Sequence, residues 1–205
     1  MTYKTEQEKF WAGNFGMDYI DRNKGEEWVA SNIALFSKIL ERTRSVSSVL
    51  ELGANIGLNL QAIHSLLPNA SITAVEINKE AVKELRNFDY INARHSSILD
   101  FKPSGKWDLA FTKGVLIHLN PDVLPETYDL LYKASRRYIL VCEYYNPSPV
   151  EITYRGHSGR LFKRDFAGEI LERHGDLTLV DYGFSYHRDP NFPQGDISWF
   201  LMEKS

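Results

Sequence analysis

Short apolar runs alternate with amphipathic segments through most of this chain. The apolar runs predict buried strands at 48–52, 72–75, 108–112 and 138–143, and a weaker one at 91–95. Apolar residues at helical spacing predict helices between them, at 58–67, 79–87 and 122–135. Strands that alternate with helices form βαβ units, so the pattern predicts an α/β fold with a mostly parallel sheet and right-handed crossovers.

The two ends of the chain depart from this alternation. Residues 1–46 are helical in pattern and precede the first strand. After residue 145 a long connection, 146–163, leads to a predicted helix at 165–174 and to strands at 178–187 and 196–203. A connection of this length is uncommon in a compact domain and is often functional. No repeat or linker divides the chain, so one domain is expected.

Composition narrows the class of partner. The 205 residues are 43% hydrophobic and 25% charged, and 24 Lys and Arg stand against 27 Asp and Glu. The net charge of -3 leaves no positive excess for binding nucleic acid, which we therefore do not expect as a partner. The N-terminus lacks a signal-peptide pattern, and no apolar run approaches the roughly 18 residues of a membrane span. We expect a cytoplasmic protein in which the one cysteine, Cys142, is an inert core thiol.

The first predicted strand leads into a glycine-containing turn and then into a helix. The turn begins at Glu51 and continues through Gly53, Ala54 and Asn55 to Gly57. Glycine at 53 permits a tight turn and a close ligand, and glycine at 57 permits close packing of helix against strand. Such a unit brings a ligand to backbone amides at a helix N-terminus.

An acid follows the second predicted strand. Glu76, followed by Ile77, can accept hydrogen bonds from both ribose hydroxyls of an adenosine cofactor. A dinucleotide fold uses the same acid, but here Asn55 replaces the middle glycine of its G-x-G-x-x-G motif. Glu51 would also repel a pyrophosphate, whereas it suits an ammonium or sulfonium group. These features favour S-adenosylmethionine over NAD, and a glycine turn without any cofactor is the other alternative.

The ends of the next two strands supply further candidates. Ser97 and Ile98 follow the third strand, where a hydroxyl meets the adenine amino group and an apolar side chain covers its ring; the alternative is ordinary loop residues. Thr112, Lys113 and Gly114 form a turn after the fourth strand, at the carboxyl edge where ligands bind in open α/β sheets.

The segment 10–23 mixes glycines with aromatic residues before the sheet begins. This composition is typical of a lid over a cofactor, and Tyr19 or Arg22 would then hold the carboxylate of a methionine moiety. The alternative is a helix that packs on the core.

Four motifs together resemble one family, the pseudaminic acid biosynthesis-associated methylases of the class I S-adenosylmethionine-dependent methyltransferase superfamily. They read ELGANIG, FTKGVLIHLNP, CEYYNPSPVEITYRGH and RLFKRDFAGE, and the resemblance covers nearly the whole chain. It implies the Rossmann-like class I methyltransferase fold, with a seven-stranded sheet in the order 3-2-1-4-5-7-6, strand 7 antiparallel, and helices on both faces. It also implies S-adenosylmethionine as the methyl donor. The family's name does not itself establish the acceptor.

We therefore expect a single methyltransferase domain, 1–205, in three parts. Residues 1–46 form an N-terminal helical lid or cap, 47–145 the cofactor-binding core, and 146–205 the acceptor loop and C-terminal strands. The substitution of Asn55 for glycine departs from the superfamily pattern, but asparagine tolerates left-handed backbone angles. A non-catalytic nucleotide-binding protein of the same fold and an NAD-dependent oxidoreductase remain as alternatives.

Aromatic, basic and amide side chains gather between the fifth strand and the helix at 165–174. Arginine forks bind carboxylate and phosphate groups bidentately, so the cluster predicts a small anionic acceptor; the alternative is a solvated surface loop. The candidate acceptor-binding residues are Tyr144, Tyr145, Asn146, Tyr154, Arg155, Arg160, Lys163 and Arg164.

Three residues are candidates for acid–base or acceptor chemistry. His118 and His157 are possible general bases because imidazole titrates near neutral pH, although His118 can equally be a helix-face residue. Glu143 ends the fifth strand and would bind an acceptor amine or hydroxyl, or else pair with a nearby arginine. The six histidines are dispersed without metal-ligand spacing, so no metal is expected. The oligomeric state is not decided by the sequence.

Overall fold

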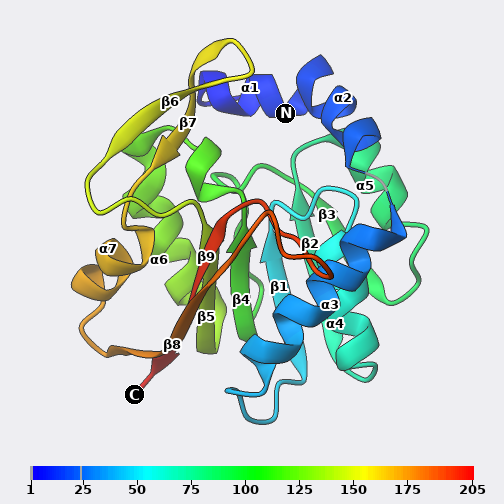
Figure 1. Ribbon diagram of the computed structural model, residues 1–205, viewed down its shortest axis with the longest axis vertical. Helices are drawn as coiled ribbons and strands as arrows, with labels where there is room; N and C mark the ends of the chain where they lie inside the picture. Colours follow the sequence, from blue (N-terminus) through cyan, green and yellow to red (C-terminus); the bar gives the residue numbers. More distant parts are fainter. Residues whose placement is uncertain (1, 24) are drawn as a thin grey trace.

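The computed structural model describes residues 2–23 and 25–205. Its centre is a mostly parallel β-sheet (Figure 1). In the described chain the main sheet has seven strands in the order β3-β2-β1-β4-β5-β9-β8, and β9 runs antiparallel to both of its neighbours. This is the order and direction that the resemblance implied. The strands are β1 (Ser48–Leu52), β2 (Ser71–Glu76), β3 (Ile91–His95), β4 (Trp107–Lys113), β5 (Ser135–Glu143), β8 (Leu177–Ser185) and β9 (Ile197–Lys204).

Helices cover both faces of this sheet (Figure 1). On one face α3 (Glu26–Leu40), α4 (Leu58–Leu66) and α5 (Lys79–Leu85) pack against alternate strand residues such as Val49. On the other, α6 (Leu124–Ala134) and α7 (Phe166–Arg173) pack against the intervening ones, such as Leu50. Successive strand side chains point to opposite faces, so continuous apolar runs are what a sheet buried on both sides requires. The α/β prediction is confirmed.

Local sequence sets the helix starts. The Asn78 side chain accepts hydrogen bonds from the backbone N–H groups of Glu80 and Ala81 at the start of α5. Asp165 does the same for Gly168 in α7. The helix expected from residue 122 begins instead at Leu124, because the preceding residues form a short 3-10 helix, η2 (Pro121–Val123), capped by Asn120.

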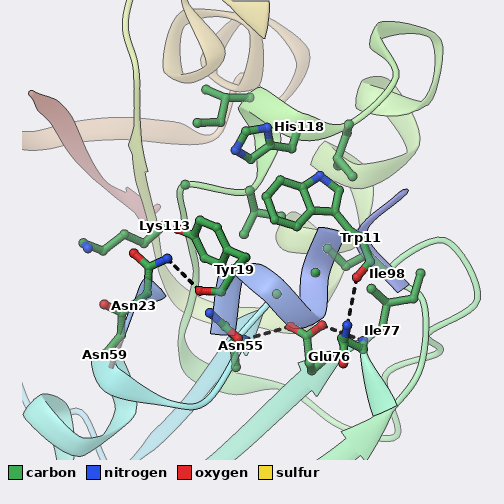
Figure 2. Close-up of a pocket in the computed structure, with 18 of the residues that line it drawn as sticks. Trp11, Tyr19, Asn23, Asn55, Asn59, Glu76, Ile77, Ile98, Lys113 and His118 are labelled. Atoms are coloured by element: carbon green, nitrogen blue, oxygen red, sulfur yellow. Dashed lines mark hydrogen bonds between the residues drawn. The ribbon is translucent and has the colours of Figure 1, made fainter. Parts of the chain in front are cut away.

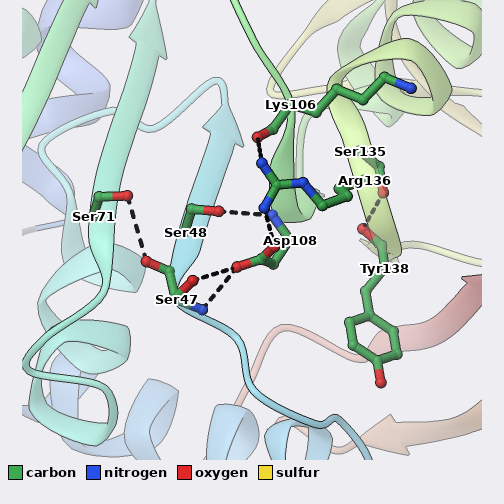
Figure 3. Close-up of polar contacts among 8 residues, drawn as sticks. All are labelled: Ser47, Ser48, Ser71, Lys106, Asp108, Ser135, Arg136 and Tyr138. Atoms are coloured by element: carbon green, nitrogen blue, oxygen red, sulfur yellow. Dashed lines mark hydrogen bonds and ion pairs between the residues drawn. The ribbon is translucent and has the colours of Figure 1, made fainter.

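Polar contacts tie β1, β4 and β5 together at their amino ends (Figure 3). The Asp108 carboxylate accepts hydrogen bonds from the Ser47 amide at 2.9 Å and the Ser47 hydroxyl at 2.7 Å, and pairs with Arg136 at 2.9 Å. The Asp108 amide donates to the Ser48 hydroxyl. Ser47 holds the pKa of Asp108 below its usual value, against the opposing effect of partial burial. These bonds join the amino ends of the three strands.

The long connection 146–163, for which the sequence pattern predicts neither helix nor strand, is largely regular. It contains a two-stranded antiparallel hairpin, β6 (Val150–Tyr154) and β7 (His157–Lys163). Arg155 and Gly156 at its tip have φ of 48° and 83°, and positive φ at both central residues is what a type I′ hairpin turn requires. Every residue of β6 is at least partly exposed, so it carries no buried face that the hydrophobic pattern could reveal.

The N-terminal region is divided between the edge and one face of the sheet. α1 (Glu6–Ala12) and α2 (Asn14–Arg22) lie across the carboxyl edge, with the hairpin beside them, while α3 packs on the core (Figure 1). α1 begins with a capping box between Thr5 and Glu8. Met1 and Lys24, which fall within the expected helical segment, lie outside the described residues. No helix in the described chain is long and apolar enough to cross a membrane.

Candidate active site

A cavity of about 310 Å³ lies between the carboxyl edge of the sheet and the helices α1 and α2 (Figure 2). Because the carboxyl ends of parallel strands meet at one edge, the turns that follow β1 to β4 all reach it. The structure thereby brings most of the predicted cofactor residues together. Those on the cavity wall are Tyr19, Gly53, Ala54, Asn55, Glu76, Ile77, Ser97, Ile98, Lys113 and Gly114.

Glu76 presents an oriented carboxylate to this cavity (Figure 2). One oxygen accepts a hydrogen bond from the Asn55 backbone amide at 2.8 Å, and the other from the Asn78 amide at 2.7 Å. The side chain is only 8% exposed; burial raises its pKa, and the backbone amides of Asn78, Asn55 and Ile77 oppose that rise. Each oxygen keeps a further lone pair, so the carboxylate can accept two more hydrogen bonds from vicinal hydroxyls.

Left-handed backbone shapes the loop after β1. Asn55 has a φ of 47°, a left-handed angle that asparagine tolerates. A Cβ on Gly57 would lie 2.7 Å from Leu85 of α5, so the close contact at this glycine is with another helix and not, as we had expected, with a strand. A Cβ on Gly53 would lie 2.6 Å from a methyl of Val115, so this glycine is also required by the turn after β4.

Glu51 is fully buried and does not lie on the cavity wall. One carboxylate oxygen accepts a hydrogen bond from the Asn59 side chain at 2.6 Å, and Asn59 does line the cavity. The other oxygen has no hydrogen-bond partner among the described residues. Burial raises the pKa of Glu51 to about 8. Lys113, on the wall, has a pKa lowered by burial, which nearby Cys142 and Glu51 partly counter.

Of the two residues proposed to hold a methionine carboxylate, Tyr19 lines the cavity and Arg22 does not. Tyr19 is on the wall, and burial raises its pKa to about 12. The Arg22 guanidinium lies 5.2 Å from the centre of the Phe15 ring, away from the cavity wall. Asn23 donates a hydrogen bond to the Tyr19 carbonyl at 2.8 Å and also lines the cavity (Figure 2).

His118 reaches the cavity from the short 3-10 helix η1 (Leu116–His118), not from the face of an α-helix. Its Nδ1 lies 2.6 Å from the carbonyl oxygen of Arg160, and burial lowers its pKa to about 4. A carbonyl only accepts hydrogen bonds, so Nδ1 carries the proton and Nε2 keeps its lone pair. His118 is therefore a neutral acceptor on the wall, beside Trp11 in Figure 2. His157 is not on the wall; its ring packs against Phe10 and Phe15.

Glu143 and Thr112 lie behind the wall. The buried Glu143 carboxylate accepts hydrogen bonds from the amides of Val115 and Leu116, both at 3.0 Å, and from Ile117 at 3.4 Å. Burial raises its pKa to about 7. Within the described chain it forms no ion pair with an arginine, in contrast to the alternative we considered. Its contacts instead shape the turn that carries Val115 and His118.

The predicted acceptor residues divide into wall, rim and surface. Tyr144 and Tyr154 line the cavity. Three basic side chains of the hairpin each lie over an aromatic ring at the rim: Arg155 over Tyr154, Arg160 over Phe10 and Lys163 over Tyr144, at 6.0, 5.0 and 5.1 Å from the ring centres.

The other three predicted acceptor residues contact parts of the protein outside the cavity. The Tyr145 ring lies 5.9 Å from that of Phe200, and the Asn146 side chain donates to the Ser148 carbonyl. Arg164 pairs with Glu169 at 2.6 Å. None of these three lies on the cavity wall.

Several wall residues were missed in the sequence analysis. Asn59 follows Gly57 on the first turn of α4, where a polar side chain before an apolar run was a usable signal. Trp11 lay inside the aromatic segment 10–23 but was not singled out. Gln194, in the β8–β9 connection, donates to Asn32 of α3 at 3.0 Å, and no local pattern marks that pair. Among the described residues, no group of His, Cys, Asp or Glu side chains is placed to hold a metal ion.

No family model matches this chain, and no curated protein matches it. Solved structures do. The plantazolicin methyltransferase BpumL in complex with SAH has a TM-score of 0.68 at 13% identity, covering 97% of this chain and 94% of its own. The 1,6-didemethyltoxoflavin-N1-methyltransferase of Burkholderia thailandensis, with S-adenosylhomocysteine bound, has a TM-score of 0.69 at 14% identity, covering 97% and 87%.

A third structure is similar along its whole length. The magnesium protoporphyrin IX methyltransferase of Synechocystis PCC 6803, with bound SAM, has a TM-score of 0.67 at 13% identity and full coverage of both chains. At this level of identity the likeness shows the fold. The chain has the Rossmann-like fold of class I methyltransferases.

Proposed function

We propose that this protein is an S-adenosylmethionine-dependent methyltransferase that acts on an oxygen or nitrogen of a small anionic metabolite. The observation that carries this proposal is the Glu76 carboxylate, held toward the cavity by the amides of Asn55 and Asn78. A carboxylate with two free acceptor positions at the end of the second strand suits the two ribose hydroxyls of an adenosine.

The rest of the wall fits the same ligand. Ile77 and Ile98 provide apolar cover for an adenine ring on one side of Glu76 (Figure 2). On the other side, Lys113 and Asn59 suit the charged end of a methionine moiety, with the orphan oxygen of Glu51 behind Asn59. The loop after β1 has Asn55 where the dinucleotide motif has its middle glycine, which supports S-adenosylmethionine over NAD.

S-adenosylmethionine supplies an electrophilic methyl group on a sulfonium centre. The protein has to position the acceptor, exclude water and receive the acceptor proton. Helices α1 and α2 cover the cavity with Trp11 and Tyr19. His118, with its proton held on Nδ1 by the Arg160 carbonyl, offers Nε2 as the proton acceptor. His157 does not line the cavity, and its ring packs against Phe10 and Phe15, so we assign it no part in this step.

The anionic acceptor is supported by the rim. Arg155, Arg160 and Lys163 bring positive charge to the hairpin beside the cavity in a chain whose net charge is negative. Following the family resemblance, we extend the proposal to an acceptor from nonulosonic (pseudaminic) acid sugar biosynthesis. Neither nucleic acid nor a membrane is part of the proposed reaction.

Calorimetry with S-adenosylhomocysteine tests the cofactor site. We expect saturable binding to the wild type, and at least about tenfold weaker binding to Glu76→Ala, since each hydrogen bond to a charged group contributes about 1.5–3 kcal/mol. Glu80→Ala is the matched control, because Glu80 is on the adjacent helix and pairs only with Lys83 among the described residues. No binding to the wild type, or equal binding to Glu76→Ala, would end the proposal.

Transfer itself is tested with a radiolabelled methyl donor and a cell extract. Label in a small acidic product supports the enzyme. Binding of S-adenosylhomocysteine without transfer to any component supports a non-catalytic protein of the same fold. A thermal shift with NAD, and none with S-adenosylhomocysteine, supports an oxidoreductase instead.

A further inference from the structure

Three buried polar atoms in one small region have no hydrogen-bond partner among residues 2–23 and 25–205. They are Oε1 of Gln7, Nε1 of Trp11 and Nε of Arg160. Buried polar groups in native proteins are nearly always paired, so a cluster of unpaired ones calls for an explanation. Gln7 is only 7% exposed, and both Gln7 and Trp11 are on the cavity wall.

Hydrogen bonds and ring contacts join these side chains into one group between α1 and the hairpin. The carbonyl oxygen of Gly159 accepts hydrogen bonds from the Gln7 amide at 2.9 Å and from Arg160 Nη1 at 3.0 Å, which places Gln7 beside Arg160. The Arg160 carbonyl holds His118, and the His118 ring centre is 4.5 Å from that of Trp11. The group therefore adjoins the proposed proton acceptor.

The chemistry of the three atoms is specific. Trp11 Nε1 and Arg160 Nε are donors, and the second belongs to a permanent cation; Gln7 Oε1 is an acceptor. Arg160 forms no ion pair with a described carboxylate, and its other recorded contacts are the Gly159 carbonyl and the Phe10 ring. Two donors with one positive charge match a carboxylate, and the adjacent acceptor matches a hydroxyl next to it.

We propose that Gln7, Trp11 and Arg160 form the acceptor subsite, and that it takes a 2-hydroxy carboxylate. Trp11 and Arg160 donate to the carboxylate, and Gln7 accepts from the hydroxyl. This inference rests on the proposed function and names the substrate class of the same site. It also accounts for the hairpin: its backbone orients His118, and its Arg160 side chain binds the acid.

The test uses the full chain saturated with S-adenosylhomocysteine and three probes of the same size. Lactate has both groups, propionate lacks the hydroxyl, and lactamide lacks the charge. The four tryptophans give four indole N–H signals in a ¹H–¹⁵N spectrum, and Trp11→Phe identifies that of Trp11. We expect lactate to shift the Trp11 signal in a saturable manner, and propionate and lactamide to need at least about fivefold higher concentrations.

Variants separate the roles of the residues. Arg160→Lys keeps the charge but removes Nε. We expect the lactate concentration that half-saturates the Trp11 shift to rise at least fivefold. Arg94→Lys, on the exposed surface of β3, is the matched control and should change it less than twofold. In Gln7→Met the preference for lactate over propionate should disappear. Unchanged far-UV circular dichroism and unchanged thermal midpoints show that these variants are folded.

The other outcomes overturn the inference. If lactate leaves the Trp11 signal unmoved while S-adenosylhomocysteine binds, the three atoms are paired by water and the subsite is wrong, although the proposed function stands. If lactamide matches lactate, the site recognises an amide instead of an acid. If S-adenosylhomocysteine fails to bind, the proposed function fails, and the lactate titration of the unliganded protein still tests the subsite.

Discussion

The Nδ1 atom of His118 lies 2.6 Å from the carbonyl oxygen of Arg160, 42 residues further along the chain. This bond joins the turn after β4 to the hairpin that follows β5. It decides which imidazole nitrogen carries the proton, and so leaves Nε2 as an acceptor on the cavity wall. The protonation of His118 is accordingly a property of the hairpin as much as of the residue.

His118 should remain neutral well below its ordinary pKa. Its pKa is lowered from 6.5 to about 4, so the unfolded chain binds more protons than the folded one between these values. Stability from this residue is present above pH 6.5 and is lost as the pH falls toward 4, by up to about 3 kcal/mol. Chemical denaturation at pH 7 and pH 4.5 should show a larger loss for the wild type than for His118→Asn. An equal loss in both proteins would contradict the prediction.

Glu51 should have the opposite pH dependence. Its pKa is raised from 4.5 to about 8, so its protonated form is favoured in the folded state. The associated stability is present below pH 4.5 and is lost as the pH rises toward 8, at about 1.4 kcal/mol per pH unit. Glu51→Gln mimics the protonated form, and its advantage in unfolding free energy over the wild type should grow between pH 5 and pH 8. The matched exposed variant Glu41→Gln should show no such trend.

Glu143 should act through the turn that it holds. Its carboxylate accepts from the amides of Val115, Leu116 and Ile117, and Glu143→Gln replaces one accepting oxygen with a donating NH₂ group. Leaving a buried amide unpaired costs about 1–3 kcal/mol, which urea denaturation would measure. Glu172→Gln, on the exposed side of α7, should be neutral. A neutral Glu143→Gln would mean that the turn does not depend on this carboxylate.

Gly53 should be required for two separable reasons. Gly53→Ala would place a Cβ 2.6 Å from Val115 and would also strain a φ of 80°. Gly156 has a similar φ of 83° with nothing within 4 Å of an added Cβ, so Gly156→Ala measures the strain alone, about 1–2 kcal/mol. We expect Gly53→Ala to cost more than Gly156→Ala, and Val115→Ala to remove the excess in the double variant. Additive losses in the double variant would rule out the clash.

Elements with a buried face were predictable, and the hairpin was not. β1, β2, β4 and β5 are buried on both sides, which forces continuous apolar runs, and the sequence shows them. β6 has no buried residue, so its pairing with β7 left no trace in the pattern. The helix patterns were right in existence, with differences of a few residues at their ends.

The floor of the cavity was likewise predictable, and its walls were not. Gly53, Glu76, Ser97 and Lys113 each lie at the end of a strand or just after it, and parallel strands bring their carboxyl ends to one edge whatever the details of packing. That His118 lines the cavity and His157 does not, in contrast, depends on which ring faces inward. The position of Arg22 over the Phe15 ring and the ion pair between Arg164 and Glu169 also depend on how side chains are oriented in the folded protein.

The sequence by itself determined the alternation of strands and helices, the glycine-containing turn at 53–57 and the acid at the end of β2. These are local properties, set by the period of the side chains and the backbone freedom of a few residues. Only the tertiary structure decided that Glu51 lies behind Asn59, that Glu143 holds a turn, and that Gln7, Trp11 and Arg160 meet. Burial and hydrogen-bond partners are set by segments distant in the chain, so no local pattern encodes them.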